Sequence, residues 1–442
     1  MIQSSQSLII STPKRLFARA DSPHRALSVN VSGFLCLSVL FTLISVDCPA
    51  VEALKNSLAN QPQNQIQSPS QAALPYTFKS GDFRLLATPS LGLDYNDNVR
   101  NSKTDKEDDF ILRPLLQLNA TQPLSHQNVI SLNLGIGYDQ YFDHSELSAL
   151  RLQSGSAVSF DVVVKEVAFN FHDRMSYTRD SSQEAAVANT SDFGNFANTA
   201  GFSISCSLRK ATLSAGYDHQ NVVSGKSTFN SQDHASEMFF GRVGFEVNPE
   251  LQAGFEATTA FTTYDQPTLN DNNVSSVGLF ATWQPGKAFR LTPRGGYSFT
   301  HFKNTSTTLQ TDDLSSYYLD LTMTHDITAA FSYGLSAGHD VRLGIQSDAV
   351  EETYVRPSVT WRAFKHASLQ FGFSYEHGKQ GAGSVGGLTE TYDWFGGTIG
   401  TSWYILDKLT LGLNYRLTLR SSDVAARGYT QNMVGLLLTY HP

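Results

Sequence analysis

Cysteine is almost absent from this chain of 442 residues, which contains only three. Two of them, Cys36 and Cys48, lie near the amino terminus, and Cys206 is the only cysteine in the rest of the chain. The main part of the protein therefore lacks the residues for an intrachain disulfide, a cysteine-based zinc site or a dithiol redox pair.

Charged residues are also scarce, at 16% of the chain compared with about 25% in ordinary globular proteins. The 32 Lys and Arg residues are outnumbered by 40 Asp and Glu residues, and the formal net charge is -8. The basic residues form no cluster of the kind that binding to a phosphate backbone needs. We therefore predict no binding of nucleic acid.

Local motifs for catalysis and metal binding are lacking as well. The histidines are scattered singly, with no His-x-x-x-His pair. We predict no enzyme, no cofactor and no metal site. Two weaker alternatives stay open: a catalytic group assembled from distant strand ends, and a calcium ion held by oxygen ligands in the polar segments 96–98 and 103–109.

Long apolar runs are limited to one segment, residues 31–46. Basic residues precede it: Lys14, Arg15, Arg19 and Arg25. Small residues that suit cleavage follow it, and the run is shorter than the ~18–20 residues that usually span a membrane as a helix. We predict a cleaved signal peptide over residues 1–53. An uncleaved anchor and lipidation at Cys48 are weaker alternatives, the second because Val46 and Asp47 are not the small residues a lipidation signal needs.

The segment that follows, 54–82, is rich in Gln, Pro, Asn and Ser and has no periodicity, so we predict a flexible periplasmic linker. The composition does not change again up to the end of the chain. Residues 83–442 are therefore predicted to form one domain.

That domain is built from about eighteen runs of about a dozen residues in which apolar and small or polar side chains alternate. The clearest run is 408–420, where one face carries Leu409, Leu411, Leu413, Tyr415, Leu417 and Leu419. A period of two is that of a β-strand. Strands of soluble proteins usually have five or six residues, whereas a tilted strand that crosses a membrane needs about 9–11. The length of the runs therefore favours the membrane.

Short and long connections between the runs alternate along the chain. The short ones lie at 164–166, 208–210, 248–250, 285–287, 327–329, 364–366 and 406–408. The long polar ones lie at 96–109, 142–148, 179–194, 220–232, 265–271, 303–311, 343–350, 378–387 and 421–427. This layout is typical of bacterial outer-membrane barrels, whose short turns are periplasmic and whose long loops face outward.

We predict an all-β fold: a closed antiparallel transmembrane β-barrel. The count is eighteen strands, or sixteen if the weakly patterned stretches 149–163 and 388–404 are not strands. Closure leaves no free edge, as lipid requires. Four prolines interrupt the runs, where we expect local bulges: Pro89, Pro114, Pro293 and Pro357.

Charged side chains recur on the face opposite the apolar one, which we expect to line the lumen. The basic residues are Arg113, Arg174, Arg242, Arg290, Arg294, Arg342, Arg356, Arg362, Arg416 and Arg420. The acidic residues are Asp94, Asp139, Glu246, Glu256, Asp320, Asp340 and Glu376. Such charges can create a transverse field that orients polar solutes, or they can pair and stiffen the wall, and both can hold at once.

The first strands carry a family resemblance. The segment 87–99, Ala-Thr-Pro-Ser-Leu-Gly-Leu-Asp-Tyr-Asn-Asp-Asn-Val, and the segment 108–114 resemble the start of the beta-barrel porin-2 family. The matching residues are Pro89, Ser90, Tyr95, Asp97, Asn98, Arg113 and Pro114. The resemblance implies a Gram-negative outer-membrane protein, sometimes in the context of exopolysaccharide production. Beyond about 30 residues it extends only as a strand pattern shared by many barrels.

These observations predict an outer-membrane channel for passive passage of small hydrophilic solutes, with lipid and the barrel assembly machinery as partners. The loop 179–194 or the loop 220–232 is expected to fold inward as a constriction. An accessory role in exopolysaccharide export or attachment is the main alternative. A structural or adhesive barrel is the third.

Overall fold

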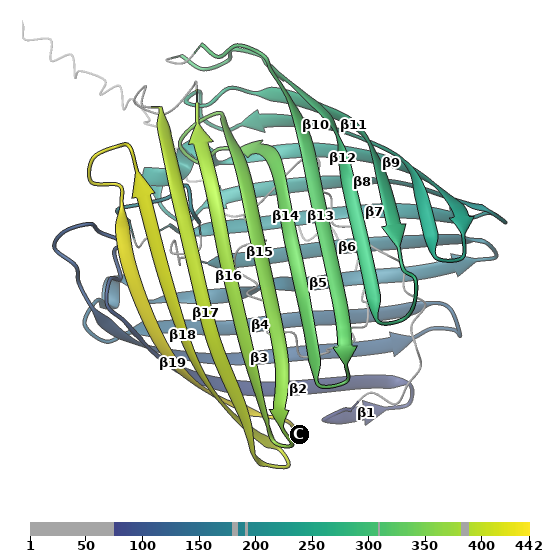
Figure 1. Cartoon of the computed structure of the whole chain (residues 1–442), viewed down its shortest axis with the longest axis horizontal. Helices are drawn as coiled ribbons and strands as arrows, with labels where there is room; N and C mark the ends of the chain where they lie inside the picture. The colour runs from purple at the N-terminus through teal and green to yellow at the C-terminus, as the bar shows by residue number, and fades with distance from the viewer. Residues whose placement is uncertain (1–74, 179–183, 191–192, 308–309, 382–388) are drawn as a thin grey trace, which may run out of the picture. The chain divides into compact units, whose positions relative to one another are not determined.

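The computed structural model of the chain describes residues 75–178, 184–190, 193–307, 310–381 and 389–442 (Figure 1). The predicted signal peptide and most of the predicted linker lie outside these residues. The strands are β1 (Phe78–Ser80), β2 (Phe83–Asn96), β3 (Asp109–Pro123), β4 (Val129–Tyr141), β5 (Ala149–Val164), β6 (Val167–Thr178), β7 (Asn195–Ser207), β8 (Ala211–Ser224), β9 (His234–Asn248), β10 (Leu251–Tyr264), β11 (Asn272–Trp283), β12 (Phe289–Phe302), β13 (Leu314–Thr328), β14 (Phe331–Leu343), β15 (Ala349–Phe364), β16 (Ala367–Gln380), β17 (Glu390–Leu406), β18 (Leu409–Ser422) and β19 (Tyr429–Tyr440). Two short 3₁₀ turns, η1 (Ser145–Leu147) and η3 (Ser227–Gln232), lie in the loops.

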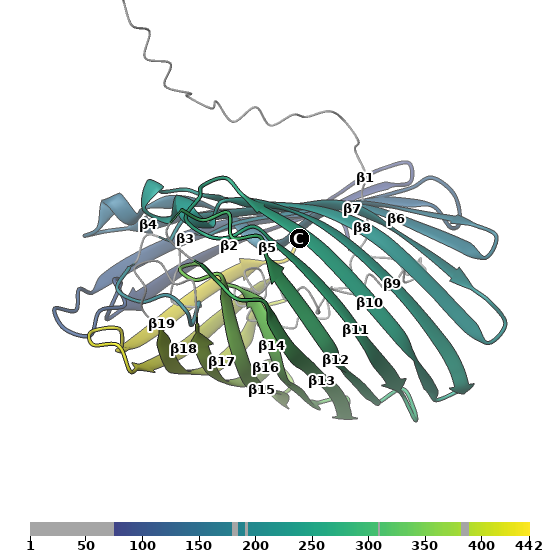
Figure 2. The ribbon, with the colours of Figure 1, turned by 90° about the horizontal axis from the view of Figure 1, so that it is seen from above.

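Strands β2 to β19 form one closed antiparallel sheet. Each strand pairs with the next in sequence, and β19 pairs with β2 to complete the ring. The prediction of eighteen strands is confirmed, including the two weakly patterned stretches, which are β5 and β17. The short strand β1 lies within the predicted linker and pairs with the start of β2. Turned by 90°, the ring shows β6 and β7 on one side and β14 to β16 on the other (Figure 2).

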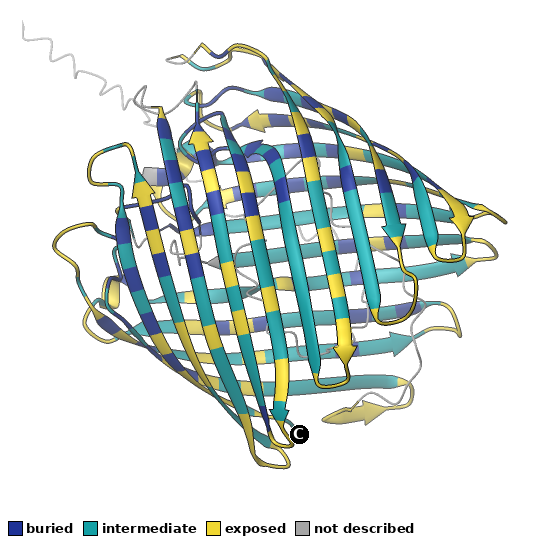
Figure 3. Cartoon of the chain, in the orientation of Figure 1, coloured by how far each residue is buried: buried dark blue, intermediate teal, exposed yellow. Residues whose placement is uncertain are grey.

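Buried and exposed residues alternate along many of the strands (Figure 3), as expected when successive side chains point to opposite surfaces of the sheet. In β10, Phe255 and Phe261 are exposed on the outer surface, whereas Glu256 and Thr262 are buried on the inner one. The same inversion holds around the ring, since most of the large exposed side chains are apolar and many buried ones are polar or charged. A water-soluble protein distributes its residues in the opposite way.

The prolines within the strands do not produce the expected bulges. Pro114 keeps its pairing with Leu91 of β2, but on the other side the ladder with β4 passes directly from Leu112 to Leu115. Pro293 and Pro357 show the same arrangement, and the register is unchanged across each gap. The missing N–H group of proline is tolerated because the hydrogen-bond ladder is interrupted on one side only.

Three inward tyrosines lie flat against the wall because each faces a glycine on the preceding strand. The directly paired residues are Tyr318 and Gly296, Tyr354 and Gly338, and Tyr392 and Gly378. A Cβ atom on Gly378 would lie 2.1 Å from the ring of Tyr392. These glycines therefore make room for rings that would otherwise point into the lumen.

Among the described residues, no helix is long and apolar enough to cross a membrane.

Candidate functional site

Part of the loop between β6 and β7 lies against a distant wall of the ring. Its described residues 184–190, which we call the strap, contact β14 to β18. Strand β16 is the ninth strand from β7 in either direction around the ring, so the strap reaches the opposite wall. It docks where β14, β16 and β18 end, which we call the long-loop end of the barrel.

Polar contacts seat the start of the strap on the wall. The carboxylate of Glu184 lies 2.7 Å from Nη2 of Arg342. The carbonyl oxygen of Ala185 accepts a hydrogen bond from Nε of Arg420 at 2.7 Å. The carbonyl oxygen of Ala186 accepts two, from Gln380 and from Arg427, each at 3.0 Å. Four wall or loop side chains therefore hold three consecutive residues.

Apolar contacts accompany them. Ala185 and Ala186 pack against Val350, Tyr392 and Trp394. The next strap residue, Val187, belongs to a separate cluster with Phe193, Phe229 and Ile345. Phe229 comes from the second loop that was expected to form a constriction, so described residues of both candidate loops pack together.

Arg342 is the centre of the ionic network beneath the strap. Its side chain is 1% exposed and contacts Glu352 at 2.7 Å and Glu376 at 3.8 Å in addition to Glu184. Glu376 also lies 3.4 Å from Arg356 and accepts a hydrogen bond from Tyr392 at 3.1 Å. Several of these groups were expected on the lumen face, but Glu184 and Glu352 were not among them.

A second network surrounds Glu390 at the same end. Arg420 approaches this carboxylate at 2.8 Å and Arg427 at 2.9 Å. Ser422 donates a further hydrogen bond at 2.6 Å. Of these residues the sequence analysis selected only Arg420.

A third network lies farther along the wall, on β9 to β13. Glu256 contacts Arg242 at 3.0 Å and Arg294 at 2.8 Å, and it accepts a hydrogen bond from Tyr318 at 3.0 Å. Asp320, paired with Arg294 in the sheet register, accepts a hydrogen bond from Tyr354 at 2.8 Å. The carboxylate of Glu256 is thus shared between the guanidinium groups of Arg242 and Arg294.

The wall that carries the strap's own strands has separate pairs. Arg113 contacts Asp94 at 3.1 Å and Asp139 at 3.7 Å. Arg151, which the sequence analysis did not select, lies 3.5 Å from Asp139. Arg174 is close enough to Asp218 for an electrostatic interaction.

The remaining candidates lie apart from the strap. Asp340 is buried and is paired in register with Glu352. Arg416 contacts the sulfur of Met433 at 3.6 Å. Arg290 and Glu246 line a polar hollow at the opposite, turn end of the barrel, and Arg362 is exposed near a turn, where it donates to the carbonyl of Ala329.

Two of the missed residues had a signal in the sequence. Glu352 shares the inward parity of Arg356, and Glu390 that of Trp394, so strict use of the period of two would have selected both. Glu184 had none, because it lies in a loop without periodicity. Its partner across the ring is set by tertiary structure alone.

No catalytic centre emerges from the part of the chain that the structure describes. The expectation that the sequence lacks every local catalytic motif was wrong in one respect, because the pattern Gly-x-Ser-x-Gly occurs at 334–338. It lies inside β14, however, whereas a nucleophile elbow needs a sharp turn between a strand and a helix. Among the described residues, no group of three or more His, Cys, Asp or Glu side chains is arranged to hold a metal ion.

Of the residues that carry the resemblance to the beta-barrel porin-2 family, Asp97 and Asn98 lie at the seam between the first and last strands of the ring. Both carboxylate oxygens of Asp97 accept hydrogen bonds from Asn432, one from the backbone and one from the side chain, each at 2.6 Å. The side chain of Asn98 donates to the carbonyl of Thr430 at 3.0 Å, and Gln431 donates to the carbonyl of Asn98 at 2.9 Å. Residues considered as calcium ligands are therefore engaged in closing the ring.

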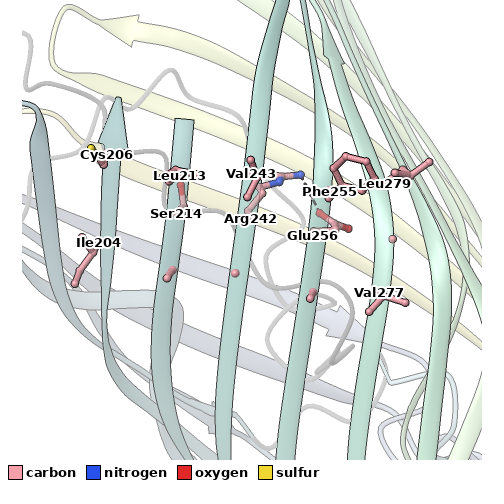
Figure 4. A pocket seen from close by; sticks show the side chains of 14 residues that line it. Ile204, Cys206, Leu213, Ser214, Arg242, Val243, Phe255, Glu256, Val277 and Leu279 are labelled. Atoms are coloured by element: carbon pink, nitrogen blue, oxygen red, sulfur yellow. Dashed lines mark hydrogen bonds and ion pairs between the residues drawn. The ribbon is translucent and has the colours of Figure 1, made fainter. Parts of the chain in front are cut away.

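The outer surface carries an apolar hollow of about 790 Å³ across β7 to β11 (Figure 4). Its floor is made of the small residues Ala215, Gly241 and Ala257, which are paired in register. Larger side chains such as Val243 and Phe255 flank it. Most of the side chains around the hollow are apolar and belong to the outward face, but Arg242 and Glu256 of the third network also line it.

Comparison with solved structures found similar chains at low sequence identity, among them an outer-membrane protein. OccK2 (OpdF) of Pseudomonas aeruginosa in complex with glucuronate matches with a TM-score of 0.48 at 11% identity, over 81% of this chain and 98% of that one. OpdK of the same organism matches with a TM-score of 0.45 at 12% identity, over 80% and 98%. OccAB3 of Acinetobacter baumannii gives 0.46 at 8% identity, over 80% and 98%. No family model and no curated protein sequence matches the chain.

Proposed function

We propose that the chain is a Gram-negative outer-membrane channel through which small hydrophilic solutes diffuse. The observation that carries the proposal is a closed ring of eighteen strands with an apolar outer surface, a charged inner wall and a strap across the lumen.

The outer surface supports the membrane location. The strands of the ring have 12 to 17 residues, enough for the ~9–11 that a tilted strand needs to cross the hydrocarbon layer. Large apolar side chains such as Phe255 and Leu279 are 61% and 59% exposed, which lipid stabilises and water does not. Closure satisfies the strand edges within the sheet.

The size of the ring supports a channel. Barrels of about 16–18 strands enclose an aqueous lumen, whereas about eight strands are filled by side chains. The strap narrows this lumen at the long-loop end, and the wall there carries carboxylates and guanidinium groups close together. Such a mouth suits solutes that are small and polar.

Export to the outer membrane also requires a signal and a route of insertion, which we assign to the amino-terminal part of the chain. We propose that residues 1–53 are the cleaved export signal, that 54–82 act as a periplasmic linker and that the barrel assembly machinery inserts the chain.

The strap favours diffusion of small solutes over the alternative of polymer export, because an extended polysaccharide would have to pass beside it.

Planar-bilayer recording tests the proposal. Purified folded protein should give stepwise ion currents, and heat-unfolded protein should give none. Swelling of liposomes that contain the protein should fall as the test sugar becomes larger, and deletion of 184–190 should raise the size limit. Folded, inserted protein without current above that of the empty bilayer would refute the channel.

A further inference from the structure

We propose that the start of the strap, residues 184–186, is a displaceable closure of the long-loop mouth, and that the ion pair between Glu184 and Arg342 is its latch. This inference rests on the proposed channel function. In the structure described above the closure is docked.

The wall does not need the strap to satisfy its own charges. When Glu184 leaves, Arg342 keeps Glu352 of β15 at 2.7 Å and Glu376 of β16 at 3.8 Å. Breaking a buried ion pair is costly mainly because it leaves one charge without a partner. Arg342 is not left without a partner when Glu184 leaves, so the free-energy cost of releasing the strap is reduced.

The side chains that bind Ala185 and Ala186 also have partners outside the strap. Arg420 and Arg427 both keep Glu390, at 2.8 and 2.9 Å, and Gln380 keeps it at 3.4 Å. Every side chain that binds residues 184–186 therefore has a second partner outside the strap. A wall with two satisfied arrangements is what a two-state closure requires.

The charges also favour release once water enters. Glu184, Glu352 and Glu376 all lie within 4 Å of the guanidinium group of Arg342, and Arg356 adds a second cation at 3.4 Å from Glu376, so three carboxylates are crowded around two arginines. Like charges in a site shielded from water repel one another. Departure of Glu184 removes one of the three and returns its carboxylate to solvent.

The apolar contact of the closure is small. Ala185 and Ala186 each bury one methyl group against Val350, Tyr392 and Trp394. Larger anchors hold the other end: Val187 lies in the cluster with Phe193, and Asn189 bonds to the carbonyl of Ala426 at 2.9 Å. The inference therefore concerns residues 184–186, with the end at Val187 to Asn189 as the fixed side.

The first test compares Glu184→Gln with wild type in single-channel recordings of the full protein. Gln cannot form the ion pair, so we expect the ratio of time in the higher-conductance level to time in the lower one to rise about 5- to 30-fold. Glu351→Gln is the matched control, since this carboxylate has the opposite parity to Glu352 and contacts His339 instead of the strap.

The second test fixes the closure with a disulfide. Ala186→Cys and Val350→Cys are combined in a chain whose three native cysteines are replaced by serine. Oxidation should hold the channel in its lower level, and a reducing agent should restore the higher one. The tether keeps Glu184, so it tests the closure even if Glu184→Gln folds poorly.

The outcomes separate the two proposals. If the channels conduct but Glu184→Gln matches Glu351→Gln and the tether changes nothing, the closure is wrong and the channel stands. If no variant conducts, including one that lacks 184–190, the channel itself is wrong. Altered level occupancy with Glu184→Gln, together with reversible locking by the tether, supports both.

Discussion

Glu184 and Arg342 form a 2.7 Å ion pair although they are 158 residues apart and come from opposite walls of the ring. Both side chains are 1% exposed. The contact joins the strap to the wall at the long-loop end of the barrel.

The charge of Glu256 should influence ion selectivity. Glu256→Gln removes the carboxylate shared by Arg242 and Arg294 and leaves two guanidinium groups on the wall with less compensation. We expect the reversal potential in a salt gradient to shift toward anion preference. Stability should fall by about 3–5 kcal/mol, as for other broken buried pairs.

Glu250→Gln serves as the control, because Glu250 lies in an exposed turn. An unchanged reversal potential with Glu256→Gln in folded protein would mean that this network braces the wall without acting on ions.

A side chain at Gly338 should displace Tyr354. A Cβ atom there would lie 2.8 Å from the hydroxyl oxygen of Tyr354 and 2.6 Å from the carbonyl oxygen of Leu319. We expect Gly338→Val to lower the free energy of unfolding by about 1–3 kcal/mol, the usual cost of overpacking. Denaturant titration of the purified barrel measures it.

Gly397→Val is the matched substitution, since nothing lies within 4 Å of a Cβ atom at that position. Equal losses for the two variants would argue against a specific role of the glycine beneath the ring.

The seam should depend on Asp97. Asp97→Ala removes both acceptors of the Asn432 hydrogen bonds, and hydrogen bonds to a charged group contribute about 1.5–3 kcal/mol each. We expect the variant to lose its folded gel mobility at a lower temperature than wild type. Asp105→Asn, in the exposed part of the same loop, should have no effect.

Acidification should loosen the loops around Arg100. Its hydrogen bond to Glu107 holds the pKa of that carboxyl below its usual value of 4.5. Because the folded pKa is depressed, the stabilisation is present above pH 4.5 and is lost as the pH falls through the lower, folded pKa. A spin label at Lys103 should therefore become more mobile only below pH 4.5.

Arg100→Met removes the cause of the depression. The mobility transition should then move to higher pH, toward 4.5. A transition that stays in place would show that another group controls this loop.

The period of two was sufficient to predict the ring, because nearly every strand separates an apolar outer surface from a polar inner one. It was weakest at the start of β17, where Tyr392 and Trp394 face inward and Asp393 faces outward. These rings support the strap, so the normal distribution of polarity is reversed there. The local pattern cannot show why, since the partner residues Ala185 and Ala186 lie in a distant loop.

The inner ion pairs could be predicted only as a set of candidates. Alternation placed Arg342 and Glu376 on one face, but the choice of partner depends on strand register and on the strap. The sequence had no information on the third carboxylate, Glu184, because a loop has no face.

Tyr318 and Tyr354, which lie over Gly296 and Gly338, affect how the strands of the wall are linked. Tyr318 of β13 reaches Glu256 of β10, and Tyr354 of β15 reaches Asp320 of β13, so these two rings link strands that are not neighbours. Hydrogen bonds that run diagonally across the sheet in this way should resist sliding of the strands past one another. We therefore expect the wall on β10 to β15 to move less than the strap if the proposed closure opens.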